Sequence, residues 1–281
     1  MVDPAFMSAG RQSSPLPMVM GILNITPDSF SDGGRYLSVD KAVDHALQMI
    51  AAGADIIDIG GESTRPGALP VSAAEELDRV VAAVEAIRRE TAIAISIDTS
   101  KPDVMRAAAA AGASMINDVR ALRADGALDA AVGLGLPVCL MHMQGEPATM
   151  QSDPRYTDVV SEVLEFLCSR AQRCVLSGMS RDQIIIDPGF GFGKTLQHNL
   201  RLLHELPRFV ATGYRVLVGL SRKSVVRALL GSPDSDLVAG SVTMALYAAR
   251  LGAHIVRVHD VRQTVEALRL QAALEQSMRG Q

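Results

Sequence analysis

The chain is short of cysteine, of long apolar runs and of positive charge, and each shortage narrows the class of protein. Its three cysteines form no C-x-x-C pair, and an odd number of thiols is typical of a reduced cytosolic protein. Lysine and arginine number 27 against 31 acidic residues, a net charge of −4, which gives no general attraction to nucleic acid or anionic membrane. No apolar run approaches the roughly 20 residues of a membrane helix. We therefore expect a cytoplasmic protein without nucleic-acid or membrane partners.

The amino-terminal segment also lacks something, namely the long apolar stretch of a secretory signal peptide. We expect residues 1–17 to form a disordered leader, derived in part from an expression tag. The remainder is 48% hydrophobic and 21% charged when the whole chain is counted, which is ordinary for a globular protein. We expect residues 18–281 to form one domain.

Eight segments of the chain share one pattern, an apolar run followed at once by polar or charged residues. They span residues 18–24, 54–64, 92–100, 114–119, 137–143, 183–189, 215–223 and 253–260. The stretches between them are rich in Ala, Leu, Glu and Arg at helical spacing. Short buried strands that alternate with helices indicate a parallel sheet. Eight such units in 281 residues predict an α/β protein with a single closed (β/α)₈ barrel, the TIM barrel.

Two predicted connections, residues 26–37 and 61–71, are longer than the few residues usual after a barrel strand. Long loops on this face are commonly lids or binding loops, so we expect both to be mobile. A helix should follow the first loop over about 39–52. Ser72 and Glu75 have the spacing of a capping box and predict the next helix start. Asp153-Pro154 predicts the start of a long helix that reaches about residue 178.

Polar residues gather where the predicted strands end, which in this fold is the active-site face. Asp58, Asp98, Asn117 and Asp187 should point into the upper barrel, where burying carboxylates is costly unless they are paired or bind something. For Asp58 we favour an ion pair or a helix cap. For the other three we favour a ligand, because carboxylates accept hydrogen bonds, an amide does both and nearby Lys223 donates. This set matches the edge of a polar heterocycle.

A predicted cationic arc lies on the same face, and the ends of the seventh and eighth strands are the usual phosphate site of this fold. Its members are Arg65, Arg222, Arg257 and His259. Arginine suits phosphate oxygens, although each residue taken singly could form a surface salt bridge. His142 has two open readings, a ligand or a satisfied core histidine. No cluster has zinc-ligand spacing, so a hard cation such as Mg²⁺ shared with a phosphate is the expected metal.

The loop GFGFGKT resembles a phosphate-binding P-loop but fails its pattern, because Pro188 stands where the first glycine is required. We expect its glycines to let the backbone pass close to a planar ligand.

Seven motifs, in order and at the predicted strand ends, together resemble the dihydropteroate synthase family over about residues 18–274. They are GILNITPDSFSDGG, GGESTRPGA, SIDTSKP, INDV, IDPGFGFGK, GLSRKS and RVHDV. The resemblance implies an enzyme of folate biosynthesis that joins 6-hydroxymethyl-7,8-dihydropterin pyrophosphate to 4-aminobenzoate, giving 7,8-dihydropteroate and pyrophosphate by an SN1-like path. It also implies sulfonamide inhibitors and a homodimer.

The resemblance assigns a role to each matching position. It implies that Asp98, Asn117, Asp187 and Lys223 hold the pterin, and that Thr64, Arg65, Arg257 and His259 bind pyrophosphate. It implies that Asn24 coordinates Mg²⁺. It implies an aminobenzoate site of Phe30, Pro66, Phe192, Ser221 and Arg222. Asp98, Lys223, Arg65 and Asp187 are the expected catalytic residues.

Two other functions fit parts of the pattern. A folate-binding methyltransferase barrel would share the pterin pocket, but it would not need SRKS, RVHD and the long Arg65 loop. A non-catalytic barrel that kept the pocket would be expected to have lost some charged positions, and none of those named is lost. A turnover assay separates these readings.

Overall fold

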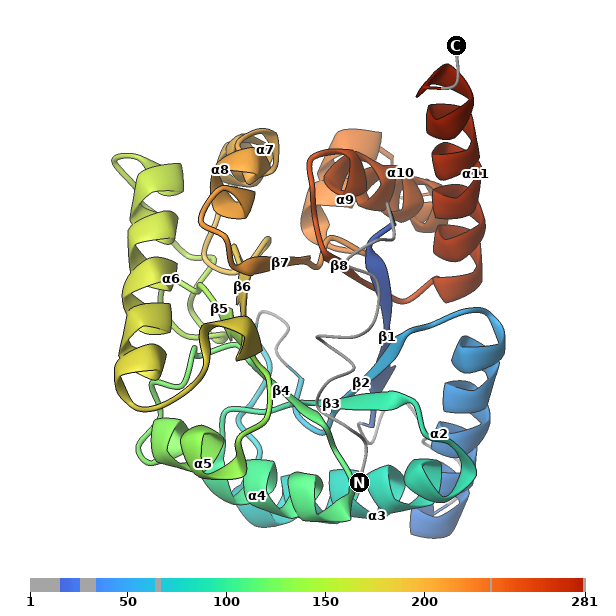
Figure 1. Ribbon diagram of the computed structural model, residues 1–281, viewed down its shortest axis with the longest axis vertical. Coiled ribbons are helices and arrows are strands. Elements are labelled where there is room, and N and C mark those ends of the chain that lie inside the picture. Colours follow the sequence, from blue (N-terminus) through green and yellow to red (C-terminus); the bar gives the residue numbers. More distant parts are fainter. Residues whose placement is uncertain (1–15, 26–33, 64–66, 233, 280–281) are drawn as a thin grey trace.

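The chain folds as the predicted closed barrel, and the computed structural model describes residues 16–25, 34–63, 67–232 and 234–279 (Figure 1). All neighbouring strands are parallel and follow chain order, and the eighth strand pairs with the first. The strands are β1 Met18–Asn24, β2 Ile56–Gly60, β3 Ala94–Asp98, β4 Met115–Asp118, β5 Val138–Met141, β6 Ile184–Asp187, β7 Arg215–Val218 and β8 Ile255–Val258. Each lies inside one of the eight predicted segments.

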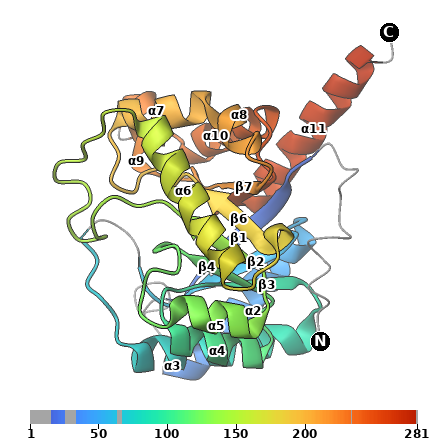
Figure 2. The ribbon, with the colours of Figure 1, turned by 60° about the vertical axis from the view of Figure 1, so that its left-hand side comes forward.

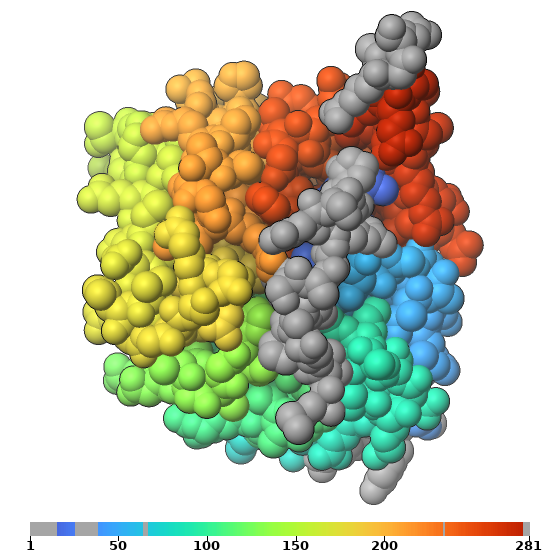
Figure 3. Space-filling view, in the orientation of Figure 1, coloured from blue at the N-terminus to red at the C-terminus, as the bar shows by residue number. Residues whose placement is uncertain are grey.

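Helices surround the barrel, and the sequence colours run once around the molecule in the ribbon and space-filling views (Figures 1 and 3). The α-helices are α2 Gly34–Ala51, α3 Ala73–Glu90, α4 Pro102–Ala111, α5 Ala127–Leu134, α6 Val159–Leu176, α7 Leu196–His204, α8 Leu206–Val210, α9 Ser224–Leu230, α10 Leu237–Arg250 and α11 Val261–Arg279. A short 3₁₀ helix, η2 Arg181–Gln183, precedes β6. The last turns of α11 extend past the barrel (Figure 2).

Two predicted helix starts are wrong, and one is confirmed. Helix α2 begins at Gly34, so residues 34–37 are helical rather than loop, and glycine is tolerated at a helix start. Helix α6 begins at Val159 because the Asp158 side chain caps it, while the backbone of Arg155 is bonded to the side chain of Gln144. The capping box of Ser72 and Glu75 is present at α3.

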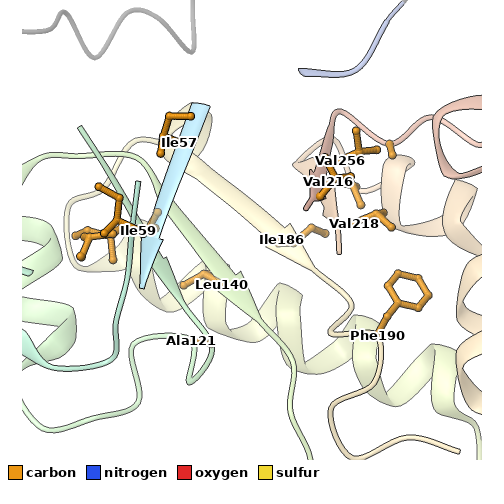
Figure 4. Packing of buried hydrophobic residues seen from close by; sticks show 14 of the residues in the cluster. Ile57, Ile59, Ala121, Leu140, Ile186, Phe190, Val216, Val218 and Val256 are labelled. Atoms are coloured by element: carbon orange, nitrogen blue, oxygen red, sulfur yellow. The ribbon is translucent and has the colours of Figure 1, made fainter. Parts of the chain in front are cut away.

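Alternating side chains divide each strand between an inner and an outer face. The outward residues, such as Ile57, Ile59 and Leu140, pack under the helices as the main hydrophobic core (Figure 4). The inward residues begin with an apolar layer that we call the floor, formed by one buried residue from each strand. The floor consists of Met20, Ile56, Ala94, Met115, Cys139, Ile185, Leu217 and Ile255.

Two residues further along each strand, the inward positions turn largely polar. They are Ile22, Asp58, Ser96, Asn117, Met141, Asp187, Gly219 and Arg257. We call this set the polar layer. A further step along β1 and β3 gives Asn24 and Asp98 at the mouth of the barrel. A single strand step thus separates the apolar floor from the charged upper part of the barrel interior, which we call the chamber.

Parts of several predicted features lie outside the described residues. These parts are residues 1–15 of the expected leader, residues 26–33 of the first long loop and residues 64–66 of the second. Leu16 is described and packs against the hydrophobic core. Within the described ranges, no helix is both long and apolar enough to cross a bilayer.

Candidate active site

The chamber above the floor is organised around the Arg257 side chain, which is 19% exposed. Its Nε donates to Asp58 Oδ2 at 2.5 Å, and its terminal nitrogen donates to Asp98 Oδ2 at 2.8 Å. Asn117 Nδ2 also donates to Asp58 Oδ2, at 3.1 Å. The structure therefore joins four strands, β2, β3, β4 and β8, through one cation, two acids and one amide.

This arrangement gives Arg257, a member of the predicted cationic arc, two acidic partners that the sequence did not predict. The guanidinium lies in the chamber, where the two buried acids Asp58 and Asp98 neutralise it. The ion-pair interpretation of Asp58 is confirmed.

Burial controls the protonation of Asp98. Desolvation raises the pKa of its carboxyl to about 7, and the nearby Arg257 charge opposes that rise. The carboxylate of Asp58 works in the same direction as burial, because a second negative charge nearby disfavours ionisation. Asp98 is thus a chamber acid that can exchange a proton near neutral pH.

Asp187, at the end of β6, and Lys223, in the segment between β7 and α9, carry a second pair of opposite charges that influence each other. Desolvation raises the pKa of Asp187, with Lys223 as the main opposing charge, and Asp187 Oδ1 accepts from the Gly189 amide at 2.7 Å. Burial lowers the pKa of Lys223 to about 8. Its Nζ donates to Phe190 O at 2.5 Å and lies 4.6 Å from the centre of the Phe192 ring. An acceptor and a donor therefore lie beside an aromatic surface.

Glycines leave the space that these side chains use. A Cβ on Gly60 would lie 3.6 Å from Asp98 Cβ and 3.8 Å from Asn24 Oδ1, so Asn24 and Asp98 both border the same opening. A Cβ on Gly219 would lie 3.8 Å from Lys223 Nζ. Larger residues here would narrow the chamber.

The rim at β7 and β8 holds two pairs. Ser221 Oγ lies 3.0 Å from His259 Nδ1 and accepts from the His259 amide at 3.1 Å. Arg222 has a left-handed backbone (φ 57°) and donates through two nitrogens to the Asp260 carboxylate, at 3.1 and 2.5 Å. Arg222 therefore forms the salt bridge that was one of its two predicted roles, although 45% of its side chain is exposed.

Lys194 is a chamber-side residue that sequence reasoning missed, although it ends the glycine loop. It is 3% exposed, and its Nζ donates to Phe192 O at 2.9 Å and lies 3.0 Å from His142 Nδ1. Burial lowers the pKa of Lys194 to about 7 and that of His142 to about 3. His142 is therefore neutral and satisfied within the protein, which decides its two readings in favour of the core histidine.

Two glycines of this loop allow a close backbone contact that was not predicted. A Cβ on Gly189 would lie 1.9 Å from His142 O, and one on Gly193 would lie 2.4 Å from Gln144 O. Both residues have positive φ angles, 71° and 61°. The backbone thus passes close to the loop after β5 at these two glycines.

Four predicted site residues, Phe30, Thr64, Arg65 and Pro66, lie outside the described residues. The base of the second long loop, after β2, lies within the described residues. It holds a cluster of charged side chains that the sequence did not lead us to expect. Lys101 Nζ contacts the carboxylates of Glu62 and the fully buried Glu76. Glu62 Oε1 also accepts from the Val71 amide at 3.2 Å, across the neck of the loop. The sequence did contain a signal for this contact, because Lys101 follows the third predicted strand closely and two acids, Glu62 and Glu76, flank the loop after the second.

The chain is similar to known proteins over nearly its whole length. The family model described as pterin binding enzyme matches residues 20–259. A dihydropteroate synthase of Escherichia coli (strain K12) is 55% identical over 254 residues, which cover 90% of each chain. The structure of Yersinia pestis dihydropteroate synthase with a sulfonamide drug complex has a TM-score of 0.89, 50% identity and coverage of 95% of this chain and 98% of its own.

A third match carries the expected product as its ligand. The dihydropteroate synthase from Xanthomonas albilineans in complex with 7,8-dihydropteroate has a TM-score of 0.84 and 48% identity. It covers 95% of this chain and 97% of its own.

Proposed function

The chain belongs to the dihydropteroate synthase family of pterin-binding enzymes, and on that premise we propose how its own residues divide the work of the reaction. The enzyme joins the methylene of 6-hydroxymethyl-7,8-dihydropterin pyrophosphate to the amine of 4-aminobenzoate. A carbon–oxygen bond breaks, a carbon–nitrogen bond forms, and pyrophosphate and a proton are released. The two solved relatives that hold a sulfonamide drug complex and 7,8-dihydropteroate support the same ligands here.

The pterin lies in the chamber and is held by Asp98, Asn117, Asp187 and Lys223. Two carboxylates and an amide oxygen accept from the ring and exocyclic N–H groups, and the ammonium donates to a carbonyl or ring nitrogen. Asn117 and Asp187 are buried, and desolvation raises the pKa of Asp98 and lowers that of Lys223. This supports the assignment, because a desolvated ionised group is costly unless something pairs with it. This concentration of paired charge above an apolar floor is the observation that carries the proposal.

Pyrophosphate binds at the barrel mouth beside the carboxyl ends of β7 and β8, through Arg257 and His259, with Thr64 and Arg65 from the second loop. Arg257 serves both subsites, because its guanidinium already faces Asp98 in the chamber. Charge that develops on the departing oxygen is offset by Arg65 and Arg257, which act without reorganisation once they are in place.

Mg²⁺ fits the mouth of the barrel as a partner of pyrophosphate. Asn24 presents its Oδ1 at this opening, and the described residues contain no group of three His, Cys, Asp or Glu side chains that would cage a metal. A single amide ligand suits an ion that keeps several waters and takes its other ligands from substrate phosphates. The ion supplies charge neutralisation for the leaving group.

The aminobenzoate subsite lies above the pterin, between Phe192, Ser221 and Arg222, with Phe30 and Pro66 contributed by the two long loops. Arg222 is tied to Asp260 and so presents a fixed edge, and Ser221 is tied to His259. A sulfonamide drug occupies the same subsite by mimicking aminobenzoate.

The reaction follows an SN1-like path. The electron-rich dihydropterin bears positive charge as its carbon–oxygen bond breaks, and the Asp98 carboxylate stabilises that charge. Lys223, Arg65 and Asp187 complete the catalytic set by holding the ring and the leaving group in line. The two long loops, after β1 and after β2, exclude water that would otherwise trap the cation.

The assembly we propose is a cytoplasmic homodimer formed through the α9–α11 side of the barrel. Five large apolar side chains are exposed on these three neighbouring helices, an unusual concentration for a free surface. They are Leu229, Leu230, Tyr247, Leu270 and Leu274.

Turnover is the direct test of the proposed function. The chain should form dihydropteroate from the two substrates with Mg²⁺, and chelation should stop the reaction. Failure to form product from intact, folded protein would leave a pterin-binding barrel without this activity.

A further inference from the structure

One carboxylate oxygen in the polar layer serves two neighbours at once. Asp58 is fully buried, and its Oδ2 accepts from both Asn117 Nδ2 and Arg257 Nε. Its Oδ1 has no hydrogen-bond partner and is also buried. Keeping a whole charge in this position is costly, so the residue should do something that an apolar side chain cannot.

We infer that Asp58 is a positioning residue, which orients the Asn117 amide and acts as the resident counterion of Arg257, so that Asp98 is left available to the pterin. The inference rests on the proposed roles of Asn117, Asp98 and Arg257. It assigns Asp58 no contact with substrate.

The first effect concerns the amide. An asparagine side chain has one accepting and one donating end, and only its hydrogen bonds decide which end faces a ligand. Asp58 is an acceptor, so it engages the Nδ2 end of Asn117 and leaves Oδ1 as the acceptor for the chamber. Together with Asp98 and Asp187, Asn117 then presents a lining of acceptors. The chamber therefore selects a heterocycle edge that carries several N–H donors.

The second effect concerns charge. Arg257 lies between Asp58 and Asp98, and each acid takes one side of the guanidinium. When pterin takes over Asp98, Arg257 still has Asp58 as its partner and no buried cation is left uncompensated. Without the Asp58 charge, Arg257 would be balanced by Asp98 alone, and pterin would have to compete with a buried ion pair.

The test is a thermodynamic cycle on pterin binding. Calorimetric titration with 6-hydroxymethylpterin would compare the wild type with Asp58→Asn, Arg257→Gln and the double variant. Asparagine keeps the shape of Asp58 and one accepting oxygen but removes its charge. We expect Asp58→Asn to weaken pterin binding about tenfold, which is about 1.4 kcal/mol. In the Arg257→Gln background the same change should cost less than about twofold, because no cation is left to balance.

Two controls make the result specific. Ser96→Ala alters the neighbouring inward position of β3, whose buried hydroxyl has no hydrogen-bond partner, and should leave pterin affinity unchanged. In steady-state assays Asp58→Asn should raise KM for the pterin substrate and leave KM for aminobenzoate within about twofold, a split that general loosening of the barrel would not give.

The amide effect has its own cycle. It is carried out in the Arg257→Gln background, where no counterion effect remains. There Asp58→Ala removes the acceptor that holds Asn117, so its cost in pterin affinity should fall sharply when Asn117→Ala is already present. Equal costs in both backgrounds would overturn the orienting role.

Other outcomes are also decisive. Equal costs of Asp58→Asn with and without Arg257 would overturn the counterion role. If Asp58→Asn does not fold but the charge-balanced double variant folds and binds like Arg257→Gln, the counterion role is supported. Asp187→Asn separates this inference from the proposed function, since a wrong pterin pocket would leave both variants at wild-type affinity.

Discussion

Asp187 offers the sharpest single-residue test of the pterin pocket. Asp187→Asn keeps the volume of the side chain but replaces an acceptor by a donor beside the proposed ring N–H groups. A mispaired buried polar group costs about 1–3 kcal/mol, so pterin affinity should fall about tenfold or more while the fold survives. Titration calorimetry measures the change. Asp182→Asn, on the exposed η2 segment before the same strand, is the matched control and should bind pterin normally.

The buried amine of Lys194 gives a prediction about pH and stability. Burial lowers its pKa from 10.5 to about 7, so between these values the unfolded chain binds more protons than the folded one. The free energy of unfolding contributed by this group therefore rises with pH from about 7 to about 10. The Lys194→Met variant has no titrating amine at this position. Lys223 titrates in both proteins, so its contribution cancels in the comparison.

Urea unfolding at several pH values measures the difference. The stability of the wild type should rise relative to that of Lys194→Met as the pH is raised through this window. A difference that stays constant with pH would contradict the burial of a titrating amine at this position.

At the scale of elements, the loop after β6 packs closely against the loop after β5, and glycine is needed where the two backbones approach. Gly193 and Gly135 have nearly the same backbone conformation, with φ angles of 61° and 64°. A Cβ on Gly193 would lie 2.4 Å from Gln144 O, whereas a Cβ on Gly135 would meet nothing within 4 Å. Both Gly→Ala changes cost about 1–2 kcal/mol for the left-handed backbone. Gly193→Ala should cost about 1–3 kcal/mol more, because of the clash.

Denaturant unfolding of the two variants isolates the packing contribution. Gly193→Ala should also raise KM for aminobenzoate, because Phe192 lies next to the displaced residue, while Gly135→Ala should not. Equal stabilities would mean that the two loops separate readily.

The elements themselves were largely predictable from the sequence, and the reason is physical. Each barrel strand is buried on both faces, so it appears as a continuous apolar run, and the residues that follow it are polar because they face the chamber or solvent. The helix starts were less predictable. Asp153-Pro154 has the local signal of a start, but Gln144, eleven residues before Arg155, holds that segment out of the helix.

The sequence predicted which residues line the candidate site better than it predicted which of their charges contact one another. Asp98, Asn117, Asp187 and Arg257 do border one chamber, because they end parallel strands. Which charge faces which depends on the stagger of the closed barrel, where β8 pairs with β1 and brings Arg257 to Asp58 across 199 positions of sequence. The contact between Arg257 and Asp58 therefore cannot be predicted from the spacing of the two residues along the chain.

At the scale of the whole molecule, the exposed apolar surface on α9–α11 predicts self-association. Leu270 and Leu274 on α11 are 63% and 59% exposed. Changing both to Lys should convert the dimer to a monomer, measured by light scattering coupled to size exclusion. Leu176→Lys, at the end of α6 and 78% exposed, should leave the dimer intact. A wild-type monomer would remove the proposed assembly.

We also expect the binding of aminobenzoate to depend on the binding of Mg²⁺ and pyrophosphate. Two proposed aminobenzoate residues, Phe30 and Pro66, belong to the same loops that the family resemblance links to Mg²⁺ and pyrophosphate through Asn24 and Arg65. Aminobenzoate should therefore bind well only when both are present, and sulfonamides should behave alike. Calorimetry with and without Mg²⁺ and pyrophosphate tests this, and equal affinity in both conditions would mean a preformed subsite.

The floor of the barrel makes the chamber a well with one opening. Its eight apolar side chains come one from each strand and are buried, so nothing passes through the base. The proposed pterin subsite lies deeper than the proposed aminobenzoate subsite, and both are reached from the mouth of the barrel. A ligand bound near the mouth would therefore block the deeper subsite. With the proposed subsites stacked in this way, we expect the pterin to bind before the aminobenzoate, and an aminobenzoate that binds first to block the pterin subsite. We expect the joined product to leave by the same opening, with its aminobenzoate end first.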